Sequence, residues 1–217
     1  MSPPDASQLL RAGLLDATAV LVAGPAPADE PVSPAEGVAP RIVEQCAALG
    51  AEVRRCAVLD EAGHSLAEEA IEADVGRVLG ELGRIDVLVV DCGALFAAAG
   101  EERDRDGLIV SLDGAWTVTR AVAGGAFLAA GQPGRIIYVA PRPSAGPHAE
   151  AARAGLENLA RTLSIEWSRH RLAPLAIAPG DHTEPGELSA LLAYLASPAG
   201  AYFSGCLLDL RGPAAIA

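Results

Sequence analysis

Few side chains in this chain could move a proton or attack a carbonyl group. The sequence has three tyrosines, four cysteines and four histidines, and all 16 of its basic side chains are arginines because lysine is absent. A tyrosine that acts as a general acid near neutral pH needs a neighbouring cation to lower the pKa of its phenol. No Tyr–Lys pair can therefore form anywhere in this chain.

The cysteines and histidines are scattered along the chain. They show neither C-x-x-C spacing nor the paired spacing of metal ligands, and they lie at Cys46, Cys56, Cys92 and Cys206, and at His64, His148, His170 and His182. This distribution predicts reduced thiols without disulfides and no metal site. Cys92, at the end of a predicted strand, could be a nucleophile, but no base can be assigned to it and a small buried thiol is the simpler interpretation.

Composition narrows the classes of protein and partner. With 217 residues, 51% of them hydrophobic and only 4% aromatic, the chain is expected to form one domain with an aliphatic core. Its net charge of -12 repels nucleic acids and anionic membranes. No stretch is apolar for about 18 residues and no leader peptide is evident, so we predict a cytoplasmic protein with no membrane span.

Strand-like apolar runs alternate with helical patterns along the chain. We predict strands at 17–23, 52–58, 85–90, 135–139, 172–177 and 206–210, and helices at 41–49, 65–82, 108–130, 149–169 and 186–195. This order predicts a single α/β, doubly wound, Rossmann-like domain, with a mostly parallel sheet of about six or seven strands and helices on both faces.

A short N-terminal extension, 1–15, precedes the first predicted strand, and a segment rich in proline and acid, 24–40, follows that strand. In a Rossmann-like domain the pyrophosphate of a dinucleotide binds in the position of this second segment.

From about residue 85 onward, the chain resembles the short-chain dehydrogenase/reductase family. The resemblance rests on GRIDVLVVDCG, LDGAWTVTRAV, GRIIYVAP, ARAGLENLARTLSIEW, LAPLAIAPGDHT and LLAYLASPAGAYFSGCLLDLRG, which follow the family's order over more than half of the chain. Two parts are shorter than in the family. One strand–helix unit is missing between 51 and 82, and few residues separate Pro179-Gly180 from the helix at 186, where relatives carry a lid over the substrate.

The resemblance places the family's catalytic tetrad on four different residue types. The asparagine falls on Ser111, the serine on Pro141, the tyrosine on Ala149 and the lysine on Arg153. All four positions are changed, so we predict that the chain has no catalytic residues of the family's kind.

The glycine-rich cofactor loop of the family is also changed. After Gly24 come four prolines and three acids, and the family's later glycines fall on Gly37 and Ala39. Proline supplies no N–H donor, and acids repel a pyrophosphate. We therefore expect no cofactor, with NAD(P) bound only if the chain is a divergent reductase. The remaining candidates for cofactor contacts are Gly24, Asp60, Gly93, Pro179, Gly180 and Thr183.

Asp60 and Arg153 each have a second interpretation. Asp60 could hold a ribose hydroxyl, although an aspartate at this point commonly begins a turn. Halohydrin dehalogenases, which are relatives without a dinucleotide, use arginine in the lysine position, and Arg153 is similar to that. Such a cofactor-independent lyase would need Ser144, His148 or Tyr138 to compensate for the lost serine and tyrosine. Arg153 is otherwise an ion-pairing helix residue.

The helices predicted at 108–130 and 149–169 keep broad apolar faces. In the family these two helices pair across a dimer axis, and the last helix and strand form a second interface. The resemblance therefore gives as interface candidates Leu112, Trp116, Ala123, Phe127, Leu156, Leu159, Leu163, Trp167 and Tyr202. The apolar faces predict an oligomer, either of this chain alone or with a paralogue.

Two functional hypotheses follow. In the first, the chain is a non-catalytic subunit that assembles with an active short-chain dehydrogenase/reductase and stabilises or completes it. In the second, it is an enzyme itself, either a divergent NAD(P)-dependent oxidoreductase acting on a carbonyl or hydroxyl group, such as an acyl-thioester or steroid-like substrate, or a lyase of the dehalogenase kind. A small-molecule sensor on the same scaffold is a third possibility.

Overall fold

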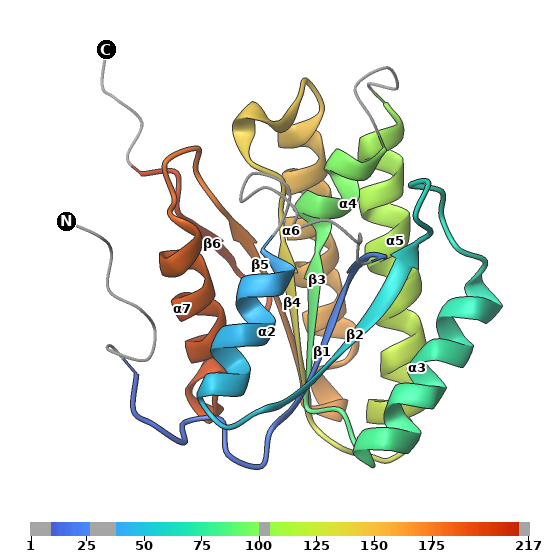
Figure 1. Ribbon diagram of the computed structural model, residues 1–217, viewed down its shortest axis with the longest axis vertical. Coiled ribbons are helices and arrows are strands. Elements are labelled where there is room, and N and C mark those ends of the chain that lie inside the picture. The colour runs from blue at the N-terminus through green and yellow to red at the C-terminus, as the bar shows by residue number, and fades with distance from the viewer. Residues whose placement is uncertain (1–9, 27–37, 100–104, 213–217) are drawn as a thin grey trace.

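The computed structural model describes residues 10–26, 38–99 and 105–212. Its six strands form one parallel sheet in the order β2-β1-β3-β4-β5-β6 (Figure 1). They are β1 (Ala19–Pro25), β2 (Glu52–Leu59), β3 (Val87–Asp91), β4 (Gly134–Val139), β5 (Leu172–Ala178) and β6 (Leu207–Asp209). The strand order reverses between β1 and β3, and this is the point where doubly wound sheets bind ligands. The predicted fold class is confirmed.

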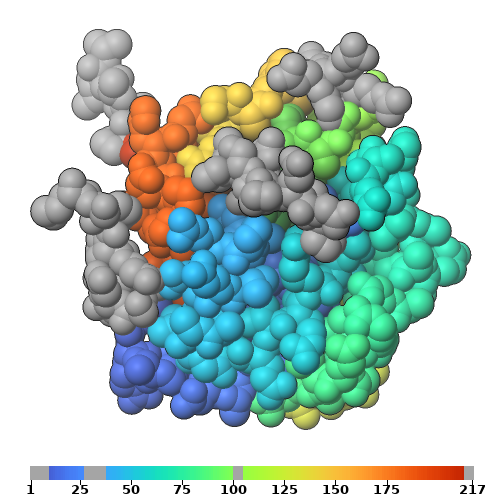
Figure 2. All heavy atoms as spheres, viewed as in Figure 1, coloured from blue at the N-terminus to red at the C-terminus, as the bar shows by residue number. Residues whose placement is uncertain are grey.

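Helices cover both faces of this sheet. They are α2 (Ala39–Ala48), α3 (Glu68–Leu82), α4 (Cys92–Ala98), α5 (Asp106–Val122), α6 (Ala149–Glu166) and α7 (Pro185–Ala196). Helices α2 and α7 lie side by side on one face, while α3, α5 and α6 cover the other (Figure 1). From the α2 side, α2 and the edge strand β2 form a continuous surface beside α3 (Figure 2).

The strands are apolar on both faces because each face is covered. All residues of β3 and β5 are buried. Along β3, Leu88 and Val90 pack into the core under α3, α5 and α6, whereas Val87 and Val89 pack into the core under α2 and α7. This explains why the sequence shows continuous apolar runs rather than strict alternation.

Several predicted boundaries need correction. Helix α3 begins at Glu68 rather than at residue 65, because residues 60–67 form a turn and Ser65 bridges back to Leu59. Helix α4 was not predicted. The helix expected at 108–130 ends its α-helical part at Val122 and continues as a π-helical segment over Ala123–Leu128.

The two regions expected to be short contain few elements. The chain between residues 51 and 82 contains one strand and one helix. Only residues 179–184 separate β5 from α7.

Four of the predicted interface residues are wrong in their placement. Ala123, Phe127 and Leu156 are buried within the core of the subunit, because they face the sheet, and Leu163 is buried as well. Leu112, Leu159 and Trp167 are partly buried and pack against the same core. Trp116, 43% exposed, and Tyr202, 92% exposed, do face outward. None of the helices in the described part of the chain is long and apolar enough to cross a membrane.

Candidate functional site

The carboxyl ends of β1, β3, β4 and β5 meet at one edge of the sheet. There the candidate Gly24 lies at the end of β1, and a Cβ atom on it would be 3.7 Å from the Cβ atom of Asp91 at the end of β3. Gly93 follows in α4, where a Cβ atom would lie 3.4 Å from the carbonyl oxygen of Ala140. The proline- and acid-rich segment lies largely outside the described residues, which resume at Val38.

The carboxylate of Asp91 is bonded to the N-terminus of α2. The Val38 and Ala39 N–H groups donate to Asp91 Oδ2 at 2.7 and 3.0 Å. Asp91 Oδ1 accepts a third backbone N–H, from Ala94 at 3.0 Å, and so caps α4 as well. Unpaired N–H groups at a helix N-terminus bind anions, and here an internal anion is bonded to them.

Asp91 is only 1% exposed. Its burial raises the pKa of its carboxyl group, whereas the three backbone donors and the more distant guanidinium of Arg55 act in the opposite direction. Sequence analysis missed this role. The available signal was an acid at the end of the most apolar strand, next to the segment where a phosphate would bind.

The four positions matched to the tetrad do not form a proton-transfer group. Ala149, the first residue of α6, is 1% exposed and packs with Phe96 and Ala152. Ser111 is buried in α5, and its hydroxyl has no hydrogen-bond partner among the described residues. Pro141 is buried just after β4.

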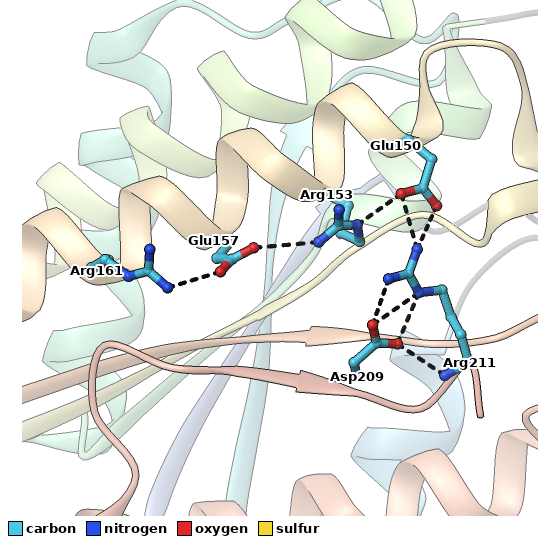
Figure 3. A network of polar contacts seen from close by, with 6 residues as sticks. All are labelled: Glu150, Arg153, Glu157, Arg161, Asp209 and Arg211. Carbon is cyan, nitrogen blue, oxygen red and sulfur yellow. Dashed lines mark hydrogen bonds and ion pairs between the residues drawn. The ribbon is translucent and has the colours of Figure 1, made fainter. Parts of the chain in front are cut away.

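Arg153 belongs to a chain of ion pairs, as predicted for a helix arginine. Its Nε donates to Glu150 at 2.9 Å and its Nη1 to Glu157 at 3.3 Å. Arg211, just after β6, reaches both oxygens of Glu150 at 2.8 and 2.9 Å and also pairs with Asp209 (Figure 3). The network thus fastens the end of β6 to the first turn of α6.

This network predicts a small loss of stability in acid. Arg211 lowers the pKa of Asp209 to about 2, below the ordinary value of 3.8. A lowered folded-state pKa gives stability that is present above the unfolded-state value and is lost as the pH falls through the folded-state one. Denaturant unfolding between pH 4 and 2 should therefore show a loss below about 1 kcal/mol, because the pair is exposed, and Asp209→Asn should remove that part of the pH dependence. An unchanged pH profile in this variant would contradict the assignment.

The short loop after β5 is closed by its own polar contacts. Arg142 Nη1 donates to the carbonyl oxygen of Gly180 at 2.5 Å, and its Nη2 donates to that of Thr183 at 2.7 Å. The Thr183 hydroxyl accepts from the Gly180 N–H at 2.8 Å. Gly180 also packs so closely that a Cβ atom would lie 2.8 Å from the Cα atom of Arg211. Packing and loop geometry therefore account for Gly180 and Thr183.

A shallow hollow of about 360 Å³ lies beside this loop. Its lining includes Asp181, His182, Glu187 and Arg211. The Ser144 N–H donates to Asp181 Oδ1 at 3.0 Å, which fixes one wall. His148 is at the N-cap of α6 and makes no side-chain capping bond. Pro179 is buried behind the loop.

The other reactive groups near this edge are buried. The Tyr138 hydroxyl and Thr119 Oγ1 are 2.9 Å apart in the core, and burial raises the pKa of Tyr138. Burial also raises the pKa of the Cys92 thiol well above its ordinary value. Neither side chain can therefore serve as an accessible acid or nucleophile in this conformation. All four cysteines are free, and no group of three metal-ligand side chains occurs within the described ranges.

Removal of the Tyr138 hydroxyl tests this buried pair. Tyr138→Phe should lower the free energy of unfolding by about 1–2 kcal/mol, because Thr119 Oγ1 loses its partner. Adding Thr119→Val should restore part of this loss, since both polar groups are then gone. Urea unfolding of the two variants measures both effects, and equal stability of Tyr138→Phe and the unsubstituted protein would contradict a bonded pair.

Asp60 forms a turn after β2. Its Oδ1 accepts the backbone N–H groups of Ala62 at 2.9 Å and His64 at 2.8 Å. The His64 N–H is the main cause of the lowered pKa of this carboxyl group. The turn interpretation of Asp60 is confirmed.

Solved structures named as dehydrogenases share the fold of this chain. A short-chain dehydrogenase from Mycobacterium smegmatis superposes with a TM-score of 0.76 at 22% identity, over 99% of this chain and 98% of that one. A citronellol catabolism dehydrogenase of Pseudomonas aeruginosa gives a TM-score of 0.70 at 23% identity, over 93% and 96%. No protein-family model matches the sequence.

Curated proteins extend this likeness to sequence. The uncharacterised oxidoreductase YohF of Escherichia coli is 30% identical over 142 residues, 56% of this chain and 55% of the relative. The chain is similar in sequence to this oxidoreductase over about half of its length, and its fold is that of the solved short-chain dehydrogenase. It spans about half the length of the curated relatives that it matches.

Two further curated relatives are named as dehydrogenases. One is the 2-dehydro-3-deoxy-D-gluconate 5-dehydrogenase of E. coli, 30% identical over 52% of this chain and 47% of the relative. Another is the (2S)-[(R)-hydroxy(phenyl)methyl]succinyl-CoA dehydrogenase subunit BbsD of Thauera aromatica, 33% identical over 51% of this chain and 47% of the relative.

Proposed function

We propose that this chain is a non-catalytic subunit of the short-chain dehydrogenase/reductase type, which assembles with a catalytically intact relative and stabilises or completes it. The observation that carries the proposal is the position of Asp91. Its carboxylate accepts the N–H groups of Val38 and Ala39, which a dinucleotide pyrophosphate would need at the N-terminus of α2. A dianionic ligand brought to the same place would meet a like charge.

The positions of the proton relay support the same proposal. A reductase of this family needs a phenol next to a cation, and here Ala149 supplies only a methyl group, buried against Phe96. Arg153 is held between Glu150 and Glu157, so its charge is already balanced. Tyr138, the phenol on the neighbouring strand, is enclosed in the core.

Assembly is supported by the apolar groups that remain on the surface. Ile109 and Trp116 of α5 are 44% and 43% exposed, and Ile165 at the end of α6 is 71% exposed. Large apolar side chains in contact with water favour burial against a partner. One relative carries the word subunit in its name, which is consistent with such an assembly.

A divergent NAD(P)-dependent oxidoreductase is the second candidate. The observation in its favour is that the curated relatives are named as oxidoreductases and dehydrogenases. On this hypothesis the hollow beside Asp181 and His182 would hold a carbonyl or hydroxyl substrate. The two candidates differ in dinucleotide binding, which can be measured directly.

Titration of the purified protein with NADH and NADPH, followed by nucleotide fluorescence and calorimetry, separates them. We expect no saturable binding of either nucleotide. The matched control is an active family member titrated under the same conditions. Micromolar binding by this chain would overturn the proposal and favour the oxidoreductase.

Assembly needs its own experiment. The chain is mixed, or expressed together, with an active paralogue from the same organism, and the mass of the complex and the reductase activity are measured. A hetero-oligomer whose reductase activity or stability exceeds that of the paralogue alone is expected. A chain that remains separate from every such paralogue would contradict the pairing.

A further inference from the structure

A second hollow, of about 500 Å³, lies at the end of the sheet where the strands begin, whereas the candidate site lies where they end. It is formed where β4 and β5 begin, next to the last turn of α6 and the segment before β6. Two arginines, Arg135 and Arg171, line it, together with the hydroxyl-bearing residues Ser164, Ser168 and Ser204. This is a concentration of positive charge and hydroxyl groups in a protein whose net charge is -12.

Arg135 lacks a partner for part of its guanidinium group. Its Nε is buried and has no hydrogen-bond acceptor in the described part of the chain. Asp86, the acid in the lining, is already engaged, because its Oδ2 accepts from the Ala19 N–H at 2.8 Å and from Arg84 Nε at 3.0 Å. A buried charged donor without an acceptor is costly, and burial lowers the pKa of Arg135 despite the opposing charge of Asp86. An anion in the hollow would therefore be attracted by the guanidinium charge rather than by the enclosed Nε itself.

Arg171 has a left-handed backbone conformation beside the same hollow. Its φ of 58° and ψ of 34° favour glycine over a side chain such as arginine. This conformation ends the short helix Ser168–His170, where the Arg171 N–H donates to the carbonyl oxygen of Ser168 at 3.0 Å. One N–H group of its side chain reaches the carbonyl oxygen of Gly131 at 3.3 Å, a long bond.

We propose that this hollow binds a small oxyanion, a phosphate or carboxylate group, with Arg135 and Arg171 as its principal donors. The planar guanidinium group presents several N–H donors that match the oxygens of either anion. Ser164 and Ser168 lie one helical turn apart, and their hydroxyls donate to the carbonyl oxygens of Arg161 and Ile165 at 2.7 and 2.8 Å. Rotation of these hydroxyls would turn their protons toward the anion.

The site is independent of the proposed function. It lies at the amino ends of the strands, whereas Asp91 and the α2 N-terminus lie at the carboxyl ends. Binding of an oxyanion here is therefore expected whether or not NADH binds at the other edge, and failure of one proposal leaves the other standing.

Arg171→Gly provides the sharpest test. Glycine suits a φ of 58°, so the variant should fold at least as stably as the unsubstituted protein while losing one donor. Calorimetric and thermal-shift titrations with sodium phosphate and, separately, with sodium acetate are made at constant ionic strength. Saturable binding of at least one anion is expected, with a dissociation constant raised about tenfold or more in Arg171→Gly and in Arg135→Gln.

Arg77→Gln is the matched control, because it removes the same charge from α3, where Arg77 pairs with Asp74 and Glu81. It should bind the anion as the unsubstituted protein does. Equal affinity in Arg171→Gly and the unsubstituted protein, or no saturable binding of either anion, would overturn the proposal. If Arg135→Gln does not fold, Arg171→Gly decides the question alone.

Discussion

Replacement of Asp91 by alanine should lower the free energy of unfolding by about 3–5 kcal/mol. The carboxylate is 1% exposed and accepts three backbone N–H groups, from Val38, Ala39 and Ala94. Without it, three buried donors at the starts of two helices lose their acceptor, and each such loss costs about 1–3 kcal/mol before water enters the space. The variant should therefore show one of the largest effects of any single polar substitution in this chain.

Urea unfolding followed by circular dichroism measures this effect. Asp91→Asn should fall between the alanine variant and the unsubstituted protein, because its amide keeps one acceptor oxygen but turns an N–H₂ group toward another donor. Asp113→Ala, which removes an exposed acid from α5, is the control and should change stability by less than about 0.5 kcal/mol. A loss below about 1 kcal/mol in Asp91→Ala would contradict the buried triple acceptor.

Introduction of the family's tyrosine and lysine should not create a reductase. In the double variant Ala149→Tyr, Arg153→Lys, the new ring must enter a space where the alanine is 1% exposed and lies against Phe96 and Ala152. Overpacking of this kind typically costs about 1–3 kcal/mol. The donors of α2 would still be bonded to Asp91, so a dinucleotide would gain no site.

Oxidation of NADH and NADPH with a panel of carbonyl substrates, together with urea unfolding, tests both parts of this prediction. Arg153→Lys alone is the control for the packing cost, because it leaves Ala149 in place. It keeps the positive charge beside Glu150 and Glu157 and should lose only the geometry of the two guanidinium contacts, at a small cost in stability. Measurable turnover in the double variant would contradict both the packing and the role given to Asp91.

Much of the fold could be predicted because each buried strand is a local signal. Runs such as residues 87–90 and 172–177 are apolar without interruption, as strands covered on both faces must be, and they lie in β3 and β5. The helices between them have periodic apolar positions. Because strands and helices alternate along the chain, only a few topologies are possible.

Boundaries were less predictable where a turn resembles a helix start. Ser65 precedes a helical pattern and fits an N-cap, yet the chain from Asp60 to Ala67 is held in a turn by the Asp60 carboxylate and the bridge from Leu59 to Ser65. The direction in which the apolar residues of α5 and α6 face was equally hard to predict. Periodicity showed that Phe127 and Leu156 were apolar positions, but only packing showed that they face the sheet.

The central feature of the candidate site could not be predicted from local patterns. The bond between Val38 and Asp91 joins residues 53 positions apart, so the acid at the end of β3 is visible in the sequence but its partner is not. Arg171 is ordinary in sequence, since its left-handed conformation appears only in the folded backbone. The Val38–Asp91 bond and the Arg171 conformation both depend on contacts that exist only in the folded chain, not on residue type and spacing.

The tether between Asp91 and α2 also affects how this protein responds to its surroundings. A helix end that depends on a dissolved anion becomes more stable as that anion accumulates and less stable as it is depleted. Here the counter-charge is covalently part of the chain, so its concentration at the helix end is constant. The capping of α2 by Asp91 therefore does not depend on the concentration of a dissolved anion.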